Sequence, residues 1–219
     1  MDLLLIDNSN IFIGLKNRYD YEARFNYPNF ANKLICSKKI KKIIVGSTQQ
    51  QKENATQQDS FWNYMKNKGF EVHTYERTSN GEKGVDGKIV ALGVKAILKY
   101  RTEAGVMHLM SGDLDMKPLI EEALFNKWKV VLWTWKENLN SEFKNGPLSS
   151  SIQINYLDDI ESEFVFFYNK EDSKKENIDE RKKRKSREQT ENNIAIAIIG
   201  GGLAGLAALA TFVLKKISK

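Results

Sequence analysis

The sequence predicts an α/β fold of three layers, in which a mostly parallel sheet of five or six strands lies between helices, followed by one C-terminal transmembrane helix. Short apolar runs alternate along the chain with segments whose apolar residues recur at helical spacing. Several of these runs are apolar throughout, which is typical of parallel strands buried on both faces. Such alternation of strand and helix indicates a parallel sheet with right-handed crossovers.

The apolar runs give the predicted strands in chain order: residues 2–6, 42–46, 70–75, 106–110, 129–135 and 152–157. Predicted helices cover residues 11–18 and 28–35, a segment around Phe61 and Trp62 that stops at Gly69, a segment from residue 85 onward, and residues 116–125. Residues 163–168 add a short apolar piece at the end of the domain. We expect the first three strands to run outward in order and the fourth to return beside the first, so that strand order reverses between them.

The composition limits the classes of protein that fit. A chain of 219 residues has room for one ordinary domain and an additional segment. Its single cysteine, Cys36, excludes an intrachain disulfide framework and a multi-cysteine metal site, and its apolar neighbours favour a buried thiol. His73 and His108 both lie in predicted strands, so no zinc site is expected. The net charge of +6 is compatible with a polyanionic partner without requiring one.

Acidic residues occur at three corresponding places in the predicted fold. Asp7 follows the first strand, and Ser111-Gly112-Asp113-Leu114-Asp115 follows the strand at 106–110. Asp86 lies at the start of the long helix from residue 85. Ligands of open α/β sheets bind outside the carboxyl ends of the strands where strand order reverses, so we expect these carboxylates to share one crevice. The alternative is that each Asp only caps a helix or interacts with its dipole.

Carboxylates that converge in this way repel one another unless a cation lies among them. Ligation by oxygen alone favours a hard ion, Mg²⁺ or Mn²⁺. In proteins such clusters serve phosphoryl transfer, in which the metal activates a water and stabilises the leaving oxygen. The acidic positions therefore predict metal-dependent hydrolysis of a polyanion.

Three stretches in this order resemble the NYN domain, a branch of the PIN-like nucleases: Asp7-Asn8-Ser9-Asn10, Lys83-Gly84-Val85-Asp86, and Ser111 to Asp115 followed by Met116-Lys117-Pro118-Leu119-Ile120. The resemblance covers roughly residues 1–160. It implies a PIN-like, Rossmannoid fold and a metal-dependent endoribonuclease. The family usually has Phe at the place of Met116, a departure that affects packing more than chemistry.

The same resemblance implies roles for individual residues. The catalytic and metal-binding residues would be Asp7, Asp86, Asp113 and Asp115, with Mg²⁺ or Mn²⁺ as cofactor and RNA as substrate. Asn10 and Ser111 would contact the substrate or support the ligands. The aromatic strand 129–135 could stack on bases, but packing in the core or a dimer contact is the favoured interpretation of its tryptophans.

The character of the chain changes after the predicted domain, which we place at residues 1–168. Residues 169–193 are a charged linker that includes the basic run 181–187, residues 194–214 are uncharged and long enough to cross a bilayer as a helix, and residues 215–219 are a basic tail. A GxGxxG pattern at Gly200 has no following strand or acidic residue, so we expect no FAD or NAD site. Small residues at four-residue spacing, Ala197, Gly201 and Gly205, could instead pair two such helices as a homodimer.

The sequence therefore predicts a membrane-anchored, metal-dependent endoribonuclease that hydrolyses RNA phosphodiester bonds. We expect a single-pass C-terminal anchor with the catalytic domain in the cytoplasm, because that arrangement leaves only the short tail to be translocated. The alternative is a catalytically silent RNA-binding or scaffold protein at a membrane.

Overall fold

The computed structural model describes residues 1–19, 23–34, 39–49, 55–77, 84–168, 175–187 and 189–190. The chain forms two compact units, Met1–Phe166 and Phe167–Lys219. Cys36 and the predicted transmembrane segment at residues 194–214 lie outside the described residues.

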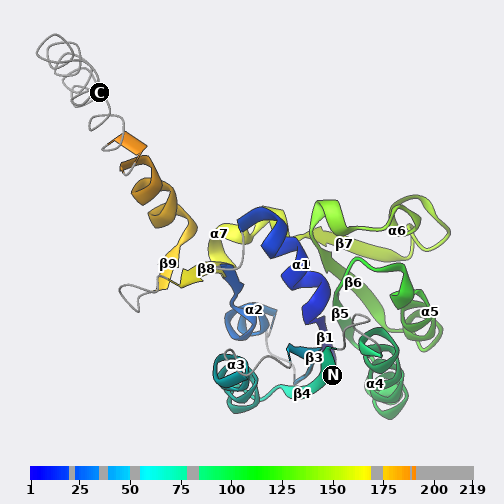
Figure 1. The fold of residues 1–219 in the computed structure, drawn as a ribbon. Coiled ribbons are helices and arrows are strands. Elements are labelled where there is room, and N and C mark those ends of the chain that lie inside the picture. Colours follow the sequence, from blue (N-terminus) through cyan, green and yellow to red (C-terminus); the bar gives the residue numbers. More distant parts are fainter. Residues whose placement is uncertain are drawn as a thin grey trace, which may run out of the picture. The chain divides into compact units, whose positions relative to one another are not determined.

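The first unit is built on a six-stranded sheet in which each pair of neighbouring strands is parallel. The strands are β1 (Asp2–Asp7), β3 (Ile40–Gln49), β4 (Glu71–Arg77), β5 (Val106–Met110), β6 (Lys129–Thr134) and β7 (Ile152–Tyr156). Their order, β4-β3-β1-β5-β6-β7, confirms the predicted reversal between the first strand and the strand at 106–110 (Figure 1). The carboxyl ends of β1 and β5 are adjacent, since Ile6 is in register with Met110.

Helices occupy the connections between these strands. They are α1 (Asn8–Tyr19), α2 (Tyr27–Leu34), α3 (Ala55–Asn67), α4 (Val85–Lys99), α5 (Lys117–Phe125), α6 (Ser141–Asn145) and α7 (Glu161–Phe164), with short 3-10 turns η2 (Arg101–Glu103), η3 (Leu114–Met116), η4 (Lys136–Asn138) and η5 (Leu157–Asp159). The structure adds strands that the sequence did not predict, among them β2 (Ala23–Phe25), which is too short to show a hydrophobic period. It also replaces the start of the predicted helix at 116–125 with η3.

The core lies on both faces of β1, whose residues are all buried. Leu3 and Leu5 pack in one cluster with Ile89 of α4 and Leu119 of α5, and these two helices lie side by side (Figure 1). Leu4 and Ile6 point to the opposite face because side chains alternate along a strand, and they are equally buried. The strand that ends at Asp7 is therefore fixed from both sides.

The tryptophans near β6 contribute mainly to packing. Trp128 and Trp135 are fully buried, which confirms the packing interpretation for these two. Trp133 is partly buried and makes an edge contact with Phe30 of α2, with ring centroids 5.0 Å apart. These contacts leave no basis for base stacking by Trp128 or Trp135.

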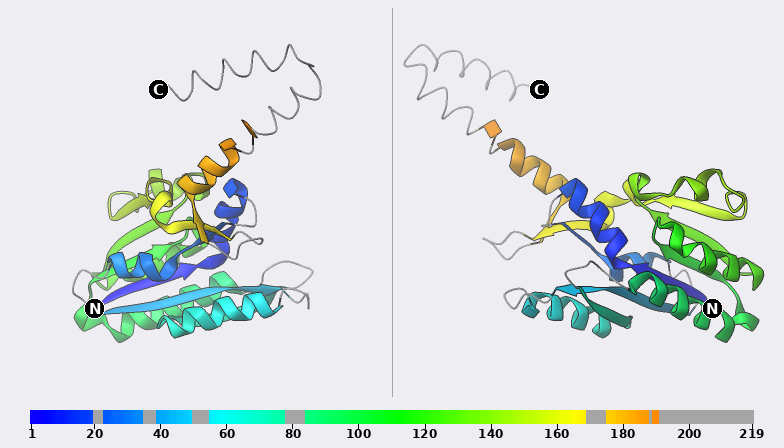
Figure 2. Two further views of the ribbon diagram at one scale, coloured as in Figure 1. Left: turned by 90° about the vertical axis from the view of Figure 1, so that its left-hand side faces the viewer. Right: turned by 45° about the vertical axis from the view of Figure 1, so that its right-hand side comes forward.

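The second unit begins within β8 (Val165–Tyr168) and continues through β9 (Lys175–Asn177) into a helix over residues 178–187. Figure 2 shows this helix in gold. Ile178 and Arg181 are buried, and the guanidinium of Arg181 lies 3.9 Å from the centre of the Phe167 ring. Over the described part of the chain, no helix is both long and apolar enough to cross a bilayer.

Candidate active site

Asp7 ends β1 and is only 2% exposed. Its Oδ1 accepts a hydrogen bond from the backbone N–H of Asn10 at 3.1 Å, and its Oδ2 accepts one from Ser111 Oγ at 3.1 Å. The first bond caps the start of α1, and the second crosses from β1 to the residue that follows β5. Both oxygens of Asp7 are therefore held at the point where strand order reverses.

Ser111 is completely buried and connects two of the predicted acidic residues. It donates to Asp7, and its Oγ accepts a hydrogen bond from the backbone N–H of Asp113 at 3.2 Å. Asp113 in turn uses its Oδ1 to cap η3, accepting from the N–H of Asp115 at 3.1 Å. Asp113 therefore does cap a helix, but the same hydrogen-bonded chain ties it to Asp7.

Asn10 completes the link between α1 and the turn after β5. Its Oδ1 accepts a hydrogen bond from the N–H of Gly112 at 3.2 Å. Because this bond fixes the oxygen, the Nδ2 amide must point the other way, and it has no partner among the described residues. Asn10 can thus donate to a bound ligand.

Gly112 lies where no side chain fits. A Cβ at this position would lie 2.2 Å from the carbonyl oxygen of Asn138 and 2.4 Å from Thr134 Oγ1. The carbonyl of Gly112 also accepts a hydrogen bond from the N–H of Asn140 at 3.0 Å. The turn that presents Asp113 is therefore packed directly against the chain that follows β6.

Asp86 lies in the first turn of α4, after Gly84, whose φ of 94° is in the left-handed region that favours glycine. Together with Asp115 it borders an open hollow of about 530 Å³. The remaining lining residues come from α4, η3 and α5: Gly87, Val90, Leu114, Lys117, Pro118 and Glu121. Asp86 and Asp115 thus face the same space, and Lys117 adds a positive charge to it.

The acidic residues interact electrostatically. The pKa of Asp7 is raised to about 6, and burial is the main cause. Hydrogen bonds from Asn10 and Ser111 act in the opposite direction, and the negative charges of Asp86 and Asp113 contribute to the rise. Asp86 and Asp113 are therefore near enough to Asp7 to repel it. Among the described residues, however, no three His, Cys, Asp or Glu side chains are grouped so that they could hold a metal ion as they stand.

The donor set nevertheless fits a hard divalent ion in its chemistry. Its oxygens are all carboxylate oxygens, and a cation would offset the repulsion that adds to the effect of burial on the pKa of Asp7. Asp86 and Asp113 are partly exposed, so their carboxylates are accessible from solvent.

One buried neighbour of the site, Tyr27, could not be predicted from the sequence. Its hydroxyl donates to Asn8 Oδ1 at 3.0 Å, next to Asp7 in the chain. Burial, with a smaller contribution from the charge of Asp7, raises the pKa of the Tyr27 hydroxyl above its ordinary value. Tyr27 therefore stays a neutral donor that fixes the first turn of α1. Tyr27 is the first residue of α2, and the fold brings this residue next to the start of α1.

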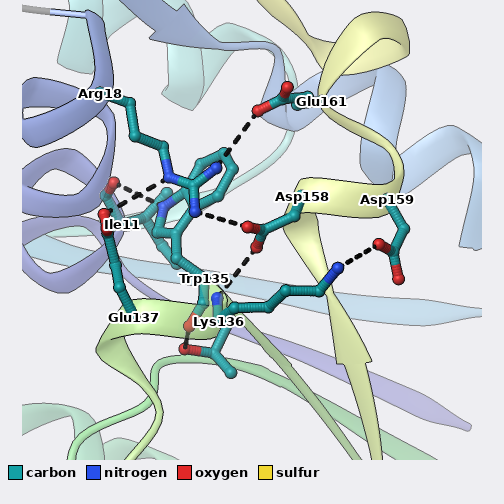
Figure 3. A network of polar contacts seen from close by, with 9 residues as sticks. Ile11, Arg18, Trp135, Lys136, Glu137, Asp158, Asp159 and Glu161 are labelled. Carbon is teal, nitrogen blue, oxygen red and sulfur yellow. Dashed lines mark hydrogen bonds and ion pairs between the residues drawn. The ribbon is translucent and has the colours of Figure 1, made fainter.

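The other end of α1 is fixed by Arg18, as Figure 3 shows. The guanidinium group pairs with Glu137 of η4, Asp158 of η5 and Glu161 of α7. It also lies 4.8 Å from the ring centre of Trp135. The indole N–H of Trp135 donates to the carbonyl of Ile11 at 3.1 Å. This network joins α1, which begins at the site, to the segment whose Asn138 packs on Gly112.

Comparison with known proteins agrees with the fold. The NYN domain family matches residues 3–147. The chain is similar in fold to a crystal structure of a protein of unknown function from Vibrio parahaemolyticus, with 18% identity and a TM-score of 0.55, over 72% of this chain and 93% of that one. No curated protein matches the chain.

Proposed function

Because the chain belongs to the NYN domain family, which has a PIN-like nuclease fold, we propose that it is a metal-dependent endoribonuclease. One observation carries the proposal: Asp7, Asp86 and Asp113 interact at the carboxyl ends of β1 and β5, where strand order reverses. A buried Asp7 that two neighbouring carboxylates repel is costly for stability, which points to chemistry rather than to packing.

The residues that would hold Mg²⁺ or Mn²⁺ are Asp7, Asp86 and Asp113, with Asp115 as a further ligand from the rim of the hollow. When bound, such an ion would offset the charge of a phosphodiester and lower the pKa of a water molecule. The protein's own part is to keep these groups in place, and Ser111 does so by donating to the carboxylate of Asp7 and accepting from the backbone N–H of Asp113.

Two other residues are suited to binding the phosphate backbone of RNA. The Nδ2 amide of Asn10 can donate to a phosphate oxygen. Lys117 borders the hollow with Asp86 and Asp115, and its ammonium group is 3.3 Å from Glu142 Oε1. Because Lys117 is only half-buried, its charge remains available to a polyanion.

The test is cleavage of single-stranded RNA of mixed sequence by residues 1–168, with Mn²⁺, with Mg²⁺ and with a chelator. We expect cleavage that depends on the metal and is lost in Asp113→Asn, which removes a charge from the site while the amide oxygen can still cap η3. Cleavage of circular RNA to linear products would show that the enzyme is an endonuclease, because a circle has no end at which an exonuclease could start. Activity of the Asp113→Asn protein equal to wild type would refute the assignment of Asp113.

A second candidate is a silent RNA-binding protein of the same fold. It is favoured by the observation that, among the described residues, no three carboxylates are close enough together to bind one metal ion. RNA binding without cleavage under all metal conditions would select it. Calorimetric titration with Mn²⁺ separates the two candidates independently of activity, because only the enzyme should bind the ion through Asp7, Asp86 and Asp113.

We also propose that the protein is anchored in a membrane by residues 194–214, with residues 1–168 on the cytoplasmic side. The support is the run of 21 uncharged residues in the sequence. Full-length protein should float with lipid vesicles and resist extraction by alkali, whereas a chain ending at residue 193 should not. Gly201→Ile with Gly205→Ile should reduce crosslinked dimers without affecting flotation, if Ala197, Gly201 and Gly205 pair two copies.

A further inference from the structure

The helix over residues 178–187 has an unusual distribution of charge. Its only acids, Asp179 and Glu180, lie in the first turn, and six of its remaining residues are basic: Arg181, Lys182, Lys183, Arg184, Lys185 and Arg187. Acids at the start and bases toward the end suit the helix dipole. That effect acts only near the ends, so it does not account for so many cations.

Contacts within the protein explain only part of this set. Arg181 is buried against Phe167, and Arg184 takes part in an interaction within the chain. The other four, Lys182, Lys183, Lys185 and Arg187, are exposed. None of these four forms an ion pair with any residue that the structure describes.

The four exposed cations surround the helix rather than forming one stripe. At about 100° per residue, Lys182 and Lys185 lie on the side of Ile178, and Lys183 and Arg187 lie on the opposite side. A partner that follows a single groove or strand would meet only half of these charges. A broad anionic surface under the end of the helix would attract all of them, because unscreened charge acts over about 8 Å at physiological salt.

The sequence beyond the helix indicates which surface this is. Six residues, 188–193, lie between Arg187 and Ile194, where the uncharged segment begins. This separation spans about 10 Å if helical and at most about 24 Å if fully extended. No aromatic residue for base stacking lies in residues 178–190, so the feature that usually accompanies binding of single-stranded RNA is missing there.

We propose that Lys182, Lys183, Lys185 and Arg187 bind the headgroups of anionic lipids at the face of the membrane that holds the tail. The inference rests on the proposed anchor. It adds that the protein prefers membranes with anionic lipids and that the end of this helix faces the membrane. A basic cluster next to a membrane segment gains about 1 kcal/mol per residue at an anionic surface, which corresponds to about a fivefold change per residue.

The experiment uses the full chain reconstituted in vesicles of phosphatidylcholine, with and without phosphatidylserine. Lysine acylation is followed at each site by mass spectrometry. We expect acylation of Lys182, Lys183 and Lys185 to be about fivefold slower with phosphatidylserine and to recover in high salt. Lys66 and Lys95, exposed on α3 and α4, are internal controls that should not change.

A matched pair of variants at Ser186 tests whether charge is the cause. Ser186 is exposed between Lys185 and Arg187. Ser186→Asp places a negative charge among the cations and should remove most of the protection, whereas Ser186→Asn has the same shape without the charge and should leave it intact. Equal protection in both variants would overturn the proposal.

The possible results distinguish failure of the lipid contact from failure of the proposed membrane anchor. Protein that does not float with either kind of vesicle refutes the anchor, whereas floating protein with the same acylation in both vesicles refutes only the lipid contact. Slower acylation in neutral vesicles after adding RNA, with no effect of phosphatidylserine, would assign the cations to RNA and overturn the lipid proposal.

Discussion

Ser111 Oγ donates a hydrogen bond to Asp7 Oδ2 at 3.1 Å, across the two strands between which the sheet reverses its order. The same oxygen accepts from the N–H of Asp113 at 3.2 Å. One buried hydroxyl thus holds the carboxylate of Asp7 and the backbone of Asp113, two residues that are far apart in the sequence. Whether the site works should therefore depend on Ser111 almost as much as on the acids themselves.

Replacement of Ser111 by Ala should affect both stability and the pH dependence of cleavage. Loss of hydrogen bonds to a buried charged group should lower the free energy of unfolding by about 1–3 kcal/mol. Because the Ser111 hydrogen bond lowers the pKa of Asp7, the variant should have a higher pKa at Asp7. The acidic limb of the pH–rate profile should then move to higher pH. Ser151→Ala, at an exposed position, is the control that should change neither quantity.

The raised pKa of Asp7 predicts a pH-dependent stability of the metal-free protein. The ordinary pKa of 3.8 applies to the unfolded chain and the value of about 6 to the folded one. The folded state therefore binds more protons between these values, and its stability falls as the pH rises through about 6. The loss is about 3 kcal/mol at about 1.4 kcal/mol per pKa unit.

Asp7→Asn lacks this titration, since its amide does not ionise. Relative to wild type, the variant should gain about 3 kcal/mol between pH 4 and pH 8, measured by urea unfolding of residues 1–168 in a chelator. Saturating Mg²⁺ should restore stability to the wild type and not to the variant. Parallel pH curves for the two proteins would show that Asp7 is not perturbed as described.

Much of the framework could be predicted from the sequence, for identifiable reasons. The strand order followed from apolar runs that alternate with helical segments, and the position of Asp7 and Asp113 followed from where those runs end. The bond between Ser111 and Asp7 could not be predicted from spacing, because it depends on the register of β1 against β5. Tyr27 and Arg18 gave no signal, because their partners come from distant segments that only the fold brings near. The tail beyond residue 190 stays a prediction.

Gly112 and Gly87 offer a comparison between two glycines of the site. In Gly112→Ala the new methyl group would collide with Asn138 and Thr134, so the free energy of unfolding should fall by about 1–3 kcal/mol and cleavage should fall with it. Gly87, in the first turn of α4, has open space within 4 Å of the position that a Cβ would take, so Gly87→Ala should be neutral or stabilise the protein by up to about 1 kcal/mol. Thermal unfolding of both variants measures the difference. Equal effects would mean that the turn at Gly112 can shift at little cost.

The last prediction concerns Arg18, which holds the far end of α1. Burial alone would raise the pKa of Asp158, but the backbone N–H of Lys136 and the guanidinium of Arg18 outweigh it and keep that pKa below its ordinary value. A lowered carboxyl pKa stabilises the fold above the unfolded value, and this contribution is lost as the pH falls through the lowered pKa. Arg18→Met should therefore cost about 2 kcal/mol at neutral pH, since the partly buried Asp158 and Glu161 lose their partner together with the exposed Glu137.

The same variant should approach wild-type stability in acid, where Asp158 is protonated in both proteins. Asp159→Asn is the matched control, because it breaks the exposed pair with Lys136 and should cost less than about 0.5 kcal/mol. If Arg18 also positions α1, Arg18→Met should weaken Mn²⁺ binding at the opposite end of that helix, whereas Asp159→Asn should not. Urea unfolding at two pH values and calorimetric titration measure these effects. A cost equal to that of the control at neutral pH would show that the network contributes little beyond an exposed ion pair.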